Sequence, residues 1–359
     1  MAWSITPTLA PSRRVPALAL LLMAACSRGQ QVEAGHNLPL DAPLPTTFAA
    51  TTRMRLGDPV VEKQLRLNGE ISQLPFQIDW QNVTGGPNTL EAFRGDALDG
   101  GAVGDTPPIH AAFTGLDVKI IAVAQRKEPS MKLGLAPHAG IKRLEDLRGK
   151  RIAYSPGQAQ GALVLRVLRK LKLADNDVRL VELSSAEFKD ALASDQVDVA
   201  PLGGPQLVRY LNAYGPKGGS AIDHGVRDGM GFYYVPTSVL RDRDKAGALR
   251  AYVALRTRAQ QWAADHIEQW VREYYIKDQH LTDEEARSLI ATVVHPSDWS
   301  EAIALTQETI DLIAKSAGRP SVDARQLFDL RFEHVAADAE LAYKAEAAAD
   351  HKPRTRDIP

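Results

Sequence analysis

Four turns rich in glycine and proline hold the residues best placed to bind a ligand. They lie at residues 85–87, 104–108, 155–161 and 201–205, and each follows a β-rich run and precedes a helical pattern. At the carboxyl ends of strands in open α/β sheets, helix N-termini present free N–H groups and the positive end of the helix dipole, which suit an anion. Each turn alone could be only a connection, but the four together indicate an anion-binding site.

The chain gives little support to chemistry based on cysteine, histidine or a metal. Its only cysteine, Cys26, cannot form an intramolecular disulfide or a multi-cysteine metal site. Its nine histidines lack the close spacing of metal ligands, and the sequence has no glycosidase or protease motif. We therefore expect no catalytic residue, no metal site and no cofactor.

The N-terminal residues predict an exported lipoprotein. Two arginines precede an apolar run at residues 15–25, which is shorter than the roughly 20 residues of a transmembrane helix and is typical of a signal peptide. Two alanines before Cys26 resemble the lipobox of bacterial lipoproteins, which implies cleavage before this cysteine and lipidation of its thiol. Residues 1–25 would then be the signal peptide and residues 26–47 a tether. An ordinary signal peptide with an unmodified cysteine is the alternative.

The rest of the chain predicts an α/β protein of two domains. Its length of 359 residues suits two domains, and its net charge of −1 gives no reason to expect a nucleic-acid partner. Up to residue 235, short β-rich runs alternate with helical patterns, which indicates mainly parallel, buried strands. Four further stretches are predicted to be helical, and we see no internal repeat; the stretches are residues 245–275, 282–293, 298–316 and 322–348.

Several segments resemble a known family. Residues 80–124, 141–154 and 190–198 are similar to extracytoplasmic substrate-binding proteins of ABC transporters for aliphatic sulfonates, taurine and nitrate, and the likeness continues into residues 260–266. The resemblance implies the two-lobed type II periplasmic binding protein fold, an α/β fold with mixed, mainly parallel sheets and a helical C-terminal segment.

The same resemblance implies where the lobes divide and how the protein works. Lobe one would comprise residues 48–136 plus 226–350 and lobe two residues 137–225, with crossings near Pro137 and residues 225–227. The lobes would close on a small organic anion by a hinge motion and deliver it to an ABC permease in the inner membrane. We expect a periplasmic monomer that is anchored to a membrane by its lipid and catalyses no reaction.

Candidate ligand contacts follow from the resemblance, residue by residue. Arg227, near the second crossing, is the best cationic candidate for contact with the anion, and a role at the hinge surface is its alternative. The two aspartates among the candidates would repel an anion, so each either caps a helix or binds a cationic part of the ligand. The remaining candidates are Asp58, Gly86, Pro87, Asp105, Thr106, Gln158 and Gln160, to which the fourth turn adds Gly203 and Gly204.

In lobe two the chain departs from this family in a way that bears on ligand size. Relatives often carry a Gly-Ser-Ser turn followed by histidine and an aromatic residue, whereas this chain has GQAQGA at residues 157–162. Residues 199–205 also lack the tryptophan of the family's corresponding run. Because these changes remove large side chains, we predict a ligand larger than taurine or a short alkanesulfonate: a larger organic sulfonate, a sulfate ester or another organic anion.

Other functions remain open on the sequence alone. The chain could be a ligand-sensing module that signals to a membrane partner, a lipid-anchored scaffold with an unused cleft, or an enzyme of the same fold such as a desulfinase. Desulfinases of this fold act through a nucleophilic cysteine, and here the sole thiol belongs to the export signal, which disfavours that alternative. Basic residues at 142–151 and 166–172 are either solvated helix faces or surfaces that dock on a permease or steer anions.

Overall fold

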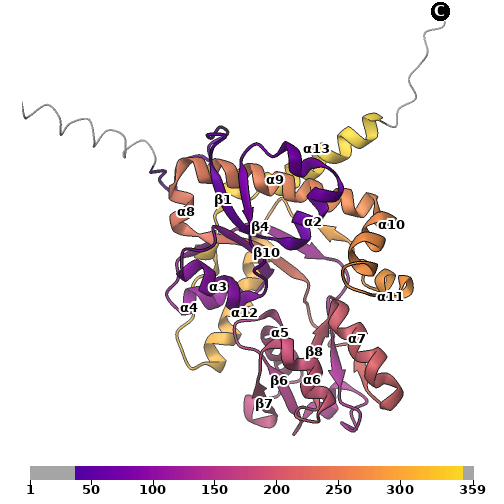
Figure 1. The fold of residues 1–359 in the computed structure, drawn as a ribbon. Coiled ribbons are helices and arrows are strands. Elements are labelled where there is room, and N and C mark those ends of the chain that lie inside the picture. Colours follow the sequence, from indigo (N-terminus) through magenta and orange to yellow (C-terminus); the bar gives the residue numbers. More distant parts are fainter. Residues whose placement is uncertain (1–36, 351–359) are drawn as a thin grey trace, which may run out of the picture.

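The computed structural model describes residues 37–350 of the chain. The predicted signal peptide, Cys26 and residues 26–36 of the predicted tether lie outside these residues. Figure 1 shows two α/β units, a larger one above and a smaller one below, with the C-terminal helices on the larger unit.

The element bounds confirm the predicted alternation of strands and helices. The strands are β1 (Arg53–Gly57), β2 (Gln77–Trp80), β3 (Gly100–Gly104), β4 (Val118–Arg126), β5 (Met131–Leu135), β6 (Arg151–Tyr154), β7 (Arg179–Glu182), β8 (Val199–Gly203), β9 (Ser220–Ile222), β10 (Met230–Pro236) and β11 (Val293–Val294). The α-helices are α2 (Pro59–Leu67), α3 (Gly86–Arg94), α4 (Pro107–Phe113), α5 (Ala159–Lys170), α6 (Phe188–Ala193), α7 (Gly204–Tyr214), α8 (Thr237–Arg241), α9 (Arg243–Asp265), α10 (Ile267–Trp270), α11 (Asp283–Ser288), α12 (Ser300–Ser316) and α13 (Val335–Asp350).

The strands form two mixed sheets that share one plan. The six-stranded sheet has the order β11-β4-β10-β3-β1-β2, and the five-stranded sheet has the order β7-β6-β8-β5-β9. We call the part built on the first sheet lobe one and the part built on the second lobe two. In each sheet three neighbouring strands run parallel, and a fourth strand, β10 or β5, pairs antiparallel with the third. The two lobes are therefore a structural repeat that we did not detect in the sequence.

One strand lies in a different lobe from the one we predicted. Strand β5 was expected in lobe one, but it pairs with β8 and β9 of the five-stranded sheet. The chain thus leaves lobe one directly after β4, and the first crossing is at residues 127–130, not near Pro137. The second crossing joins β9 to β10. An apolar strand pattern shows that a strand is buried but not which sheet buries it, and this explains the error.

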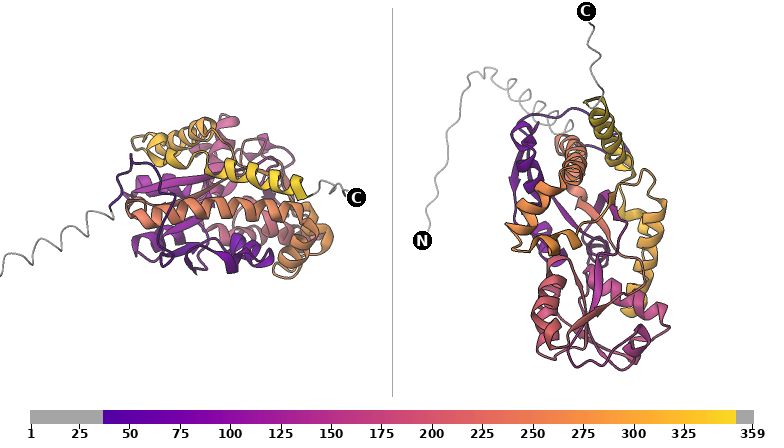
Figure 2. Two further views of the ribbon diagram at one scale, coloured as in Figure 1. Left: turned by 90° about the horizontal axis from the view of Figure 1, so that it is seen from above. Right: turned by 90° about the vertical axis from the view of Figure 1, so that its right-hand side faces the viewer.

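The helical C-terminal segment covers the sheet of lobe one. Figure 2 shows α9 and α13 side by side over this lobe, and Arg258 of α9 pairs with Glu346 of α13 at 2.9 Å. Two predicted helices are shorter than expected. Helix α11 ends at Ser288, because residues 293–294 instead pair with β4, and α13 begins only at Val335, after short 3-10 turns. Among the described residues, no helix has the length and apolar character needed to cross a membrane.

The described part of the predicted tether, residues 37–47, packs on lobe one. Leu38 is buried, and its backbone N–H donates to the carbonyl of Arg241 at 2.6 Å. Leu40 and Leu44 pack against the core of the lobe. The predicted tether is therefore too long at its C-terminal end, because its spaced leucines bury apolar surface instead of remaining in solvent.

Candidate ligand-binding site

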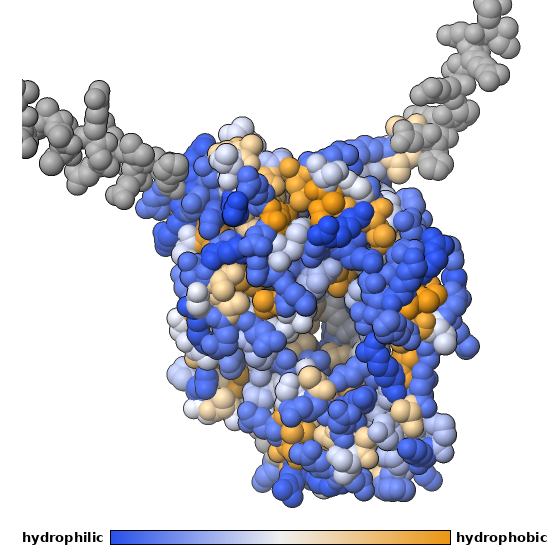
Figure 3. Space-filling model, in the orientation of Figure 1, coloured by the Kyte–Doolittle hydropathy of each residue, from blue (hydrophilic) through white to orange (hydrophobic). Residues whose placement is uncertain are grey.

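A cavity of about 460 Å³ lies between the two lobes. Its walls come from the C-terminal ends of β3 and β4 and the starts of α3, α4 and β10 in lobe one, and from the starts of α5 and β5 in lobe two. Figure 3 shows the molecule hollowed at the junction of the lobes, with a mainly hydrophilic surface around the opening. The volume is in the usual range for a small-molecule site.

The structure brings together some of the predicted contacts and separates others. Four line the cavity, namely Gly86, Asp105, Gln158 and Gln160. Six do not, namely Asp58, Pro87, Thr106, Gly203, Gly204 and Arg227. The first group lies on the turns before α3, α4 and α5, so three of the four predicted turns meet at one cavity. The turn before α7 does not take part.

Asp58 is a buried structural residue. It caps α2, and its carboxylate accepts hydrogen bonds from Arg256 Nε at 2.8 Å and from the Tyr252 hydroxyl at 3.2 Å. Only 3% of the residue is exposed. Its charge is balanced by the arginine inside lobe one, which leaves it no role at the cavity.

Asp105 lines the cavity, but its carboxylate is already occupied. One oxygen accepts from the Thr106 hydroxyl at 2.9 Å, and the other pairs with Arg166 of α5. Arg166 also donates to the Thr309 hydroxyl of α12 at 2.7 Å. Since α5 belongs to lobe two and the other partners to lobe one, Arg166 joins the two lobes. Thr106 is itself buried, and its contact with the site is the hydrogen bond to Asp105.

Asp228 joins the two crossings. Its carboxylate accepts from the backbone N–H groups of Ser130 and Met131 at 3.0 and 2.9 Å and from the Ser130 hydroxyl at 2.9 Å. Nε2 of buried His224 lies 3.4 Å away. Burial alone would raise the pKa of Asp228, but the hydrogen bonds from His224 and Ser130 lower it below its ordinary value. Asp228 is therefore a stable anion that ties β5 to the segment before β10.

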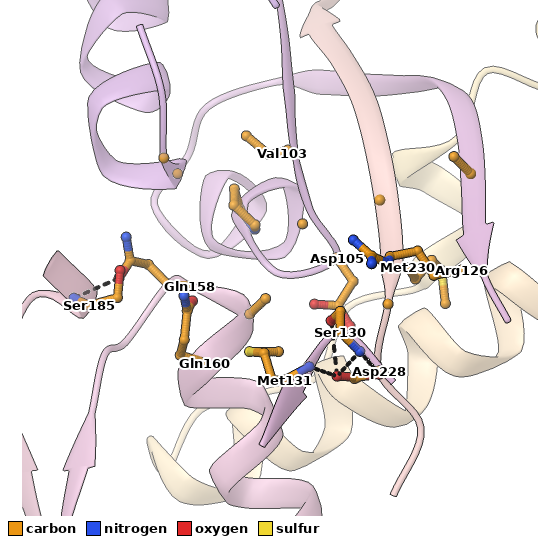
Figure 4. A pocket seen from close by; sticks show the side chains of 18 of the residues that line it. Val103, Asp105, Arg126, Ser130, Met131, Gln158, Gln160, Ser185, Asp228 and Met230 are labelled. Carbon is orange, nitrogen blue, oxygen red and sulfur yellow. Dashed lines mark hydrogen bonds between the residues drawn. The ribbon is translucent and has the colours of Figure 1, made fainter. Parts of the chain in front are cut away.

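Two glutamine side chains direct their amide oxygens away from the cavity. Oε1 of Gln158 accepts from the Ser155 hydroxyl and from the Ser185 N–H at 3.2 Å, as Figure 4 shows for Ser185. Oε1 of Gln260 accepts from Arg256 Nη1 at 3.4 Å and lies 2.8 Å from His295 Nε2. Both amide nitrogens lack a protein partner among the described residues, so they are available as donors in the cavity.

Several cavity residues were absent from our sequence candidates. Arg126 ends β4, Ser130 and Asp228 lie on the two crossings, and Gln260 lies on α9. Arg166 was considered only as a surface residue. None lies in one of the four predicted turns, although Asp228 stands between Gly225 and Gly229, which both have a positive φ. The polar residue that ends β4 and the resemblance at residues 260–266 were the other available hints.

Arg227 lies at a second cavity of about 790 Å³, on the outer side of Asp105 and Arg166. Its side chain is 57% exposed and pairs with Glu301 of α12. Arg169 and Lys170 of α5 also line this second cavity, where Arg169 pairs with Glu308 at 2.8 Å. These basic residues thus lie along the contact between α5 and α12, not in the first cavity.

Glycines allow the lobes to touch beside the cavity. A Cβ on Gly104, at the end of β3, would lie only 2.9 Å from the Cβ of Ala159 in lobe two. A Cβ on Gly157 would lie 2.9 Å from the His110 ring in lobe one, and Gly157 has a positive φ of 76°. The structure therefore has its lobes in contact along a seam of small residues, which we call the closure seam: Gly104, His110, Gly157 and Ala159.

The described residues hold no group of three or more histidine, cysteine, aspartate or glutamate side chains that could bind a metal ion.

The backbone at the helix N-termini offers N–H donors to the cavity. Helix α5 begins at the cavity, and the N–H groups of its first two residues, Ala159 and Gln160, have no intrahelical acceptor, whereas that of Gly161 donates to the Gln158 carbonyl. Helix α4 offers fewer, since its first residues are Pro107 and Pro108.

Comparison with known proteins supports the resemblance found in the sequence. The family model described as NMT1/THI5 like matches residues 102–217. An aliphatic sulfonates-binding protein of Escherichia coli K12 is 28% identical over 261 residues, which are 70% of this chain and 78% of that protein. A second aliphatic sulfonates-binding protein, from Bacillus subtilis 168, is 25% identical over 142 residues, 40% of this chain and 43% of its own.

Solved structures show the fold. The periplasmic aliphatic sulphonate binding protein SsuA of Escherichia coli matches with a TM-score of 0.64 and 25% identity, over 77% of this chain and 91% of its own. The alkanesulfonate-binding protein SsuA of Xanthomonas axonopodis pv. citri, bound to MOPS, matches with a TM-score of 0.64 and 20% identity, over 79% and 99%. DszB in complex with biphenyl-2-sulfinic acid is more distant, at a TM-score of 0.52 and 14% identity over 80% and 98%. The chain is thus a homologue of the aliphatic sulfonate-binding proteins and has the periplasmic binding protein fold.

Proposed function

We propose that the protein is the solute-binding protein of an ABC importer and captures an organic anion, a sulfonate or sulfate ester, between its lobes. One observation carries this proposal: both carboxylates and two of the amide oxygens around the cavity are used within the protein, whereas donors remain. The carboxylates of Asp105 and Asp228 and the amide oxygens of Gln158 and Gln260 all have partners. A ligand rich in acceptor oxygens therefore finds donors, and a cationic ligand finds no unoccupied carboxylate.

Hinge closure is the mechanism that these contacts support. The ligand is held between turns of both lobes, so it binds the closed arrangement better than an open one and shifts the equilibrium toward closure. Arg166 and the closure seam connect the lobes directly in the same arrangement. The closed protein then presents a defined surface to a membrane permease, which receives the ligand.

Ligand size is the sharpest test of this function. We expect the affinity, measured by calorimetric titration with a series of alkane- and arenesulfonates, to increase beyond ethanesulfonate, because the turn at 157–162 carries no histidine or aromatic side chain. Alcohols of the same carbon skeletons are the controls and should not bind. A maximum at methane- or ethanesulfonate would exclude the larger ligand. If neither sulfonates nor sulfate esters bind, the proposed function is wrong.

Export and anchoring are the second part of the proposal. The signal at residues 1–25 and the following Cys26 predict a periplasmic protein that is attached to a membrane by lipid. In the cell of origin, Cys26→Ser should move the protein from the membrane fraction to the soluble periplasmic fraction without changing ligand affinity. If the substituted protein stays membrane-bound at the same level, the lipid is not its anchor.

We propose binding without catalysis. The desulfinase alternative requires a nucleophilic thiol at the site, and the only cysteine of the chain belongs to the export signal. The cavity residues also lack a nucleophile paired with a base, since the Ser130 hydroxyl donates to a carboxylate that already has several donors. Recovery of an unchanged sulfinate after prolonged incubation with the protein would support this assignment, and release of sulfite would contradict it.

A further inference from the structure

The charged side chains of the cavity are not all balanced. Asp105 and Arg166 neutralise one another, and Asp228 is held by N–H groups of the first crossing and by His224. Arg126 is the remaining charged residue in the wall. It makes no ion pair with any residue in the described part of the chain. Its half-buried guanidinium is therefore the charged group of the wall without a direct ionic partner. The exposed carboxylate of Glu128, whose pKa is lowered mainly by the Thr292 N–H and also by Arg126, acts on it only electrostatically.

The position of Arg126 is fixed by its surroundings. It ends β4, where its backbone pairs with Val293 of β11 and donates to the Gly229 carbonyl at 3.0 Å. Nη2 donates to the Leu289 carbonyl at 3.2 Å, and Nε is buried without a partner among residues 37–350. A half-buried cation with so few partners is costly, and an anion in the cavity would offset that cost.

Arg126 and Gln158 mark opposite sides of the cavity. In Figure 4, Gln158 and Arg126 lie at the two sides of the pocket, with Val103 and Met131 between them and with Asp105, Ser130 and Asp228 beside Arg126. Gln260 belongs to the Arg126 side, because His295, the residue directly after β11, holds its amide oxygen. The cavity thus has two donor groups, one on the turn before α5 and one at the edge of β4 and β11. Apolar side chains lie between them, together with the already paired carboxylates of Asp105 and Asp228.

We infer that the ligand carries a second acidic group, a carboxylate or second sulfonate, at the end opposite its first sulfonate. Arg126 binds this second group, and the Gln158 turn with the start of α5 binds the first. An apolar chain joins the two and contacts Val103 and Met230. This inference rests on the proposed function and narrows it from organic sulfonates to dianionic ones.

Matched pairs of ligands test the inference. Alkane-1-sulfonates and ω-carboxyalkane-1-sulfonates of the same chain length differ only in the second acid, and calorimetry gives the affinity ratio within each pair. We expect the wild-type protein to prefer the carboxylated ligand by about tenfold or more at the best chain length, since hydrogen bonds to paired charges are strong. Arg126→Gln should reduce this ratio to about one. Arg148→Gln, an exposed arginine of lobe two, should leave the ratio as in the wild type.

A thermal melting curve shows whether Arg126→Gln folds. If it does not fold, a second variant, Arg126→Lys, tests the inference instead. Arg126→Lys keeps the charge and should retain a preference for the dianion. An equal affinity for both ligands of every pair in the wild-type protein overturns the inference. So does an equal loss of both in Arg126→Gln, which would place the single sulfonate at Arg126. Either result leaves the proposed function intact, whereas binding of neither series overturns that function and this inference with it.

Discussion

The negative charge of Asp58 is neutralised inside the protein, so this carboxylate is not available to repel an anion. Its three hydrogen-bond donors lie on α2 and α9, and Arg256 balances its charge inside lobe one. Asp105 and Asp228 follow the same rule with Arg166 and with the first crossing. In each case the carboxylate is occupied before a ligand arrives, and for Asp105 and Asp228 this means that the cavity presents no free carboxylate to a ligand.

Loss of the Asp58 charge should therefore destabilise the protein. Asp58→Asn keeps the shape of the side chain but leaves Arg256 as an unpaired buried cation, and we expect the free energy of unfolding to fall by about 3–5 kcal/mol. Urea denaturation measures this change. Glu301→Gln is the control, because its pair with Arg227 is exposed and should contribute at most about 1 kcal/mol. Equal effects of the two substitutions would contradict the structural role of Asp58.

At the residue scale, sequence reasoning found what is local and missed what is distant. The turn residues Gly86 and Gln158 were predicted, because a glycine-rich turn between strand and helix is a local signal. Whether Asp58 binds a ligand depends on Arg256, which lies far away in the sequence on α9. Gln260 owes its orientation to Arg256 and His295, and no local pattern encodes that arrangement.

The elements of the two lobes repeat one device that holds the sheets together. Arg55 of β1 binds Asp99 before β3 through two guanidinium nitrogens and its backbone N–H, and Arg151 of β6 binds Asp198 before β8 in the same way. Burial would raise the pKa of Asp99, but the hydrogen bonds from Arg55 lower it. In each lobe this repeat consists of two residues that are separated by some 45 positions, and two such residues are too few to produce a visible sequence repeat.

Element types were more predictable than element neighbours. The spacings Ser184-x-x-Glu187 and Thr282-x-x-Glu285 have the residue types of a capping box, and both boxes are present in the structure. The sheet to which β5 belongs was not predicted, because each strand has a similar apolar pattern. The site sits where elements from both lobes meet, so its complete residue set depends on the least predictable level of structure.

The closure seam makes a prediction about the ends of β3 and α5. Gly104→Ala places a methyl group within 2.9 Å of the Ala159 Cβ, so the lobes cannot close completely. Overpacking costs about 1–3 kcal/mol, which corresponds to a roughly fivefold to 150-fold weaker ligand affinity by calorimetry. The double variant Gly104→Ala, Ala159→Gly removes the opposing methyl group and should recover much of the affinity. No recovery would show that the seam does not control closure.

At the scale of the whole molecule, several contacts besides the closure seam connect the lobes. Asp228 ties the crossings together, Arg166 joins α5 to lobe one, and Arg209 of α7 donates to the Gln279 carbonyl at 2.8 Å. Asp228 and Arg166 line the cavity, so closure exchanges water at several polar groups for protein partners. A titratable group that loses water on closure changes its pKa, and ligand binding then depends on its protonation.

His110 is such a group, because its ring faces Gly157 across the closure seam. Burial lowers the pKa of His110, and the positive charges of Arg94 and Arg319 lower it further. In an open protein the ring regains water, and its pKa lies closer to the ordinary value of about 6.5. Below that pH the open state therefore binds more protons than the closed state, so acid favours opening.

We accordingly expect ligand affinity to be constant above about pH 7 and to weaken progressively from pH 6.5 to pH 5.5. A sulfonate stays ionised over this range, so the ligand does not contribute to the change. Calorimetry at constant ionic strength measures the effect, and His110→Asn should flatten the profile while leaving the affinity at pH 7.5 close to that of the wild type. His295, whose pKa is also lowered by burial, lies within lobe one and is not part of the seam, so it should not respond to closure. An unchanged pH profile in His110→Asn would show that closure is not linked to this histidine.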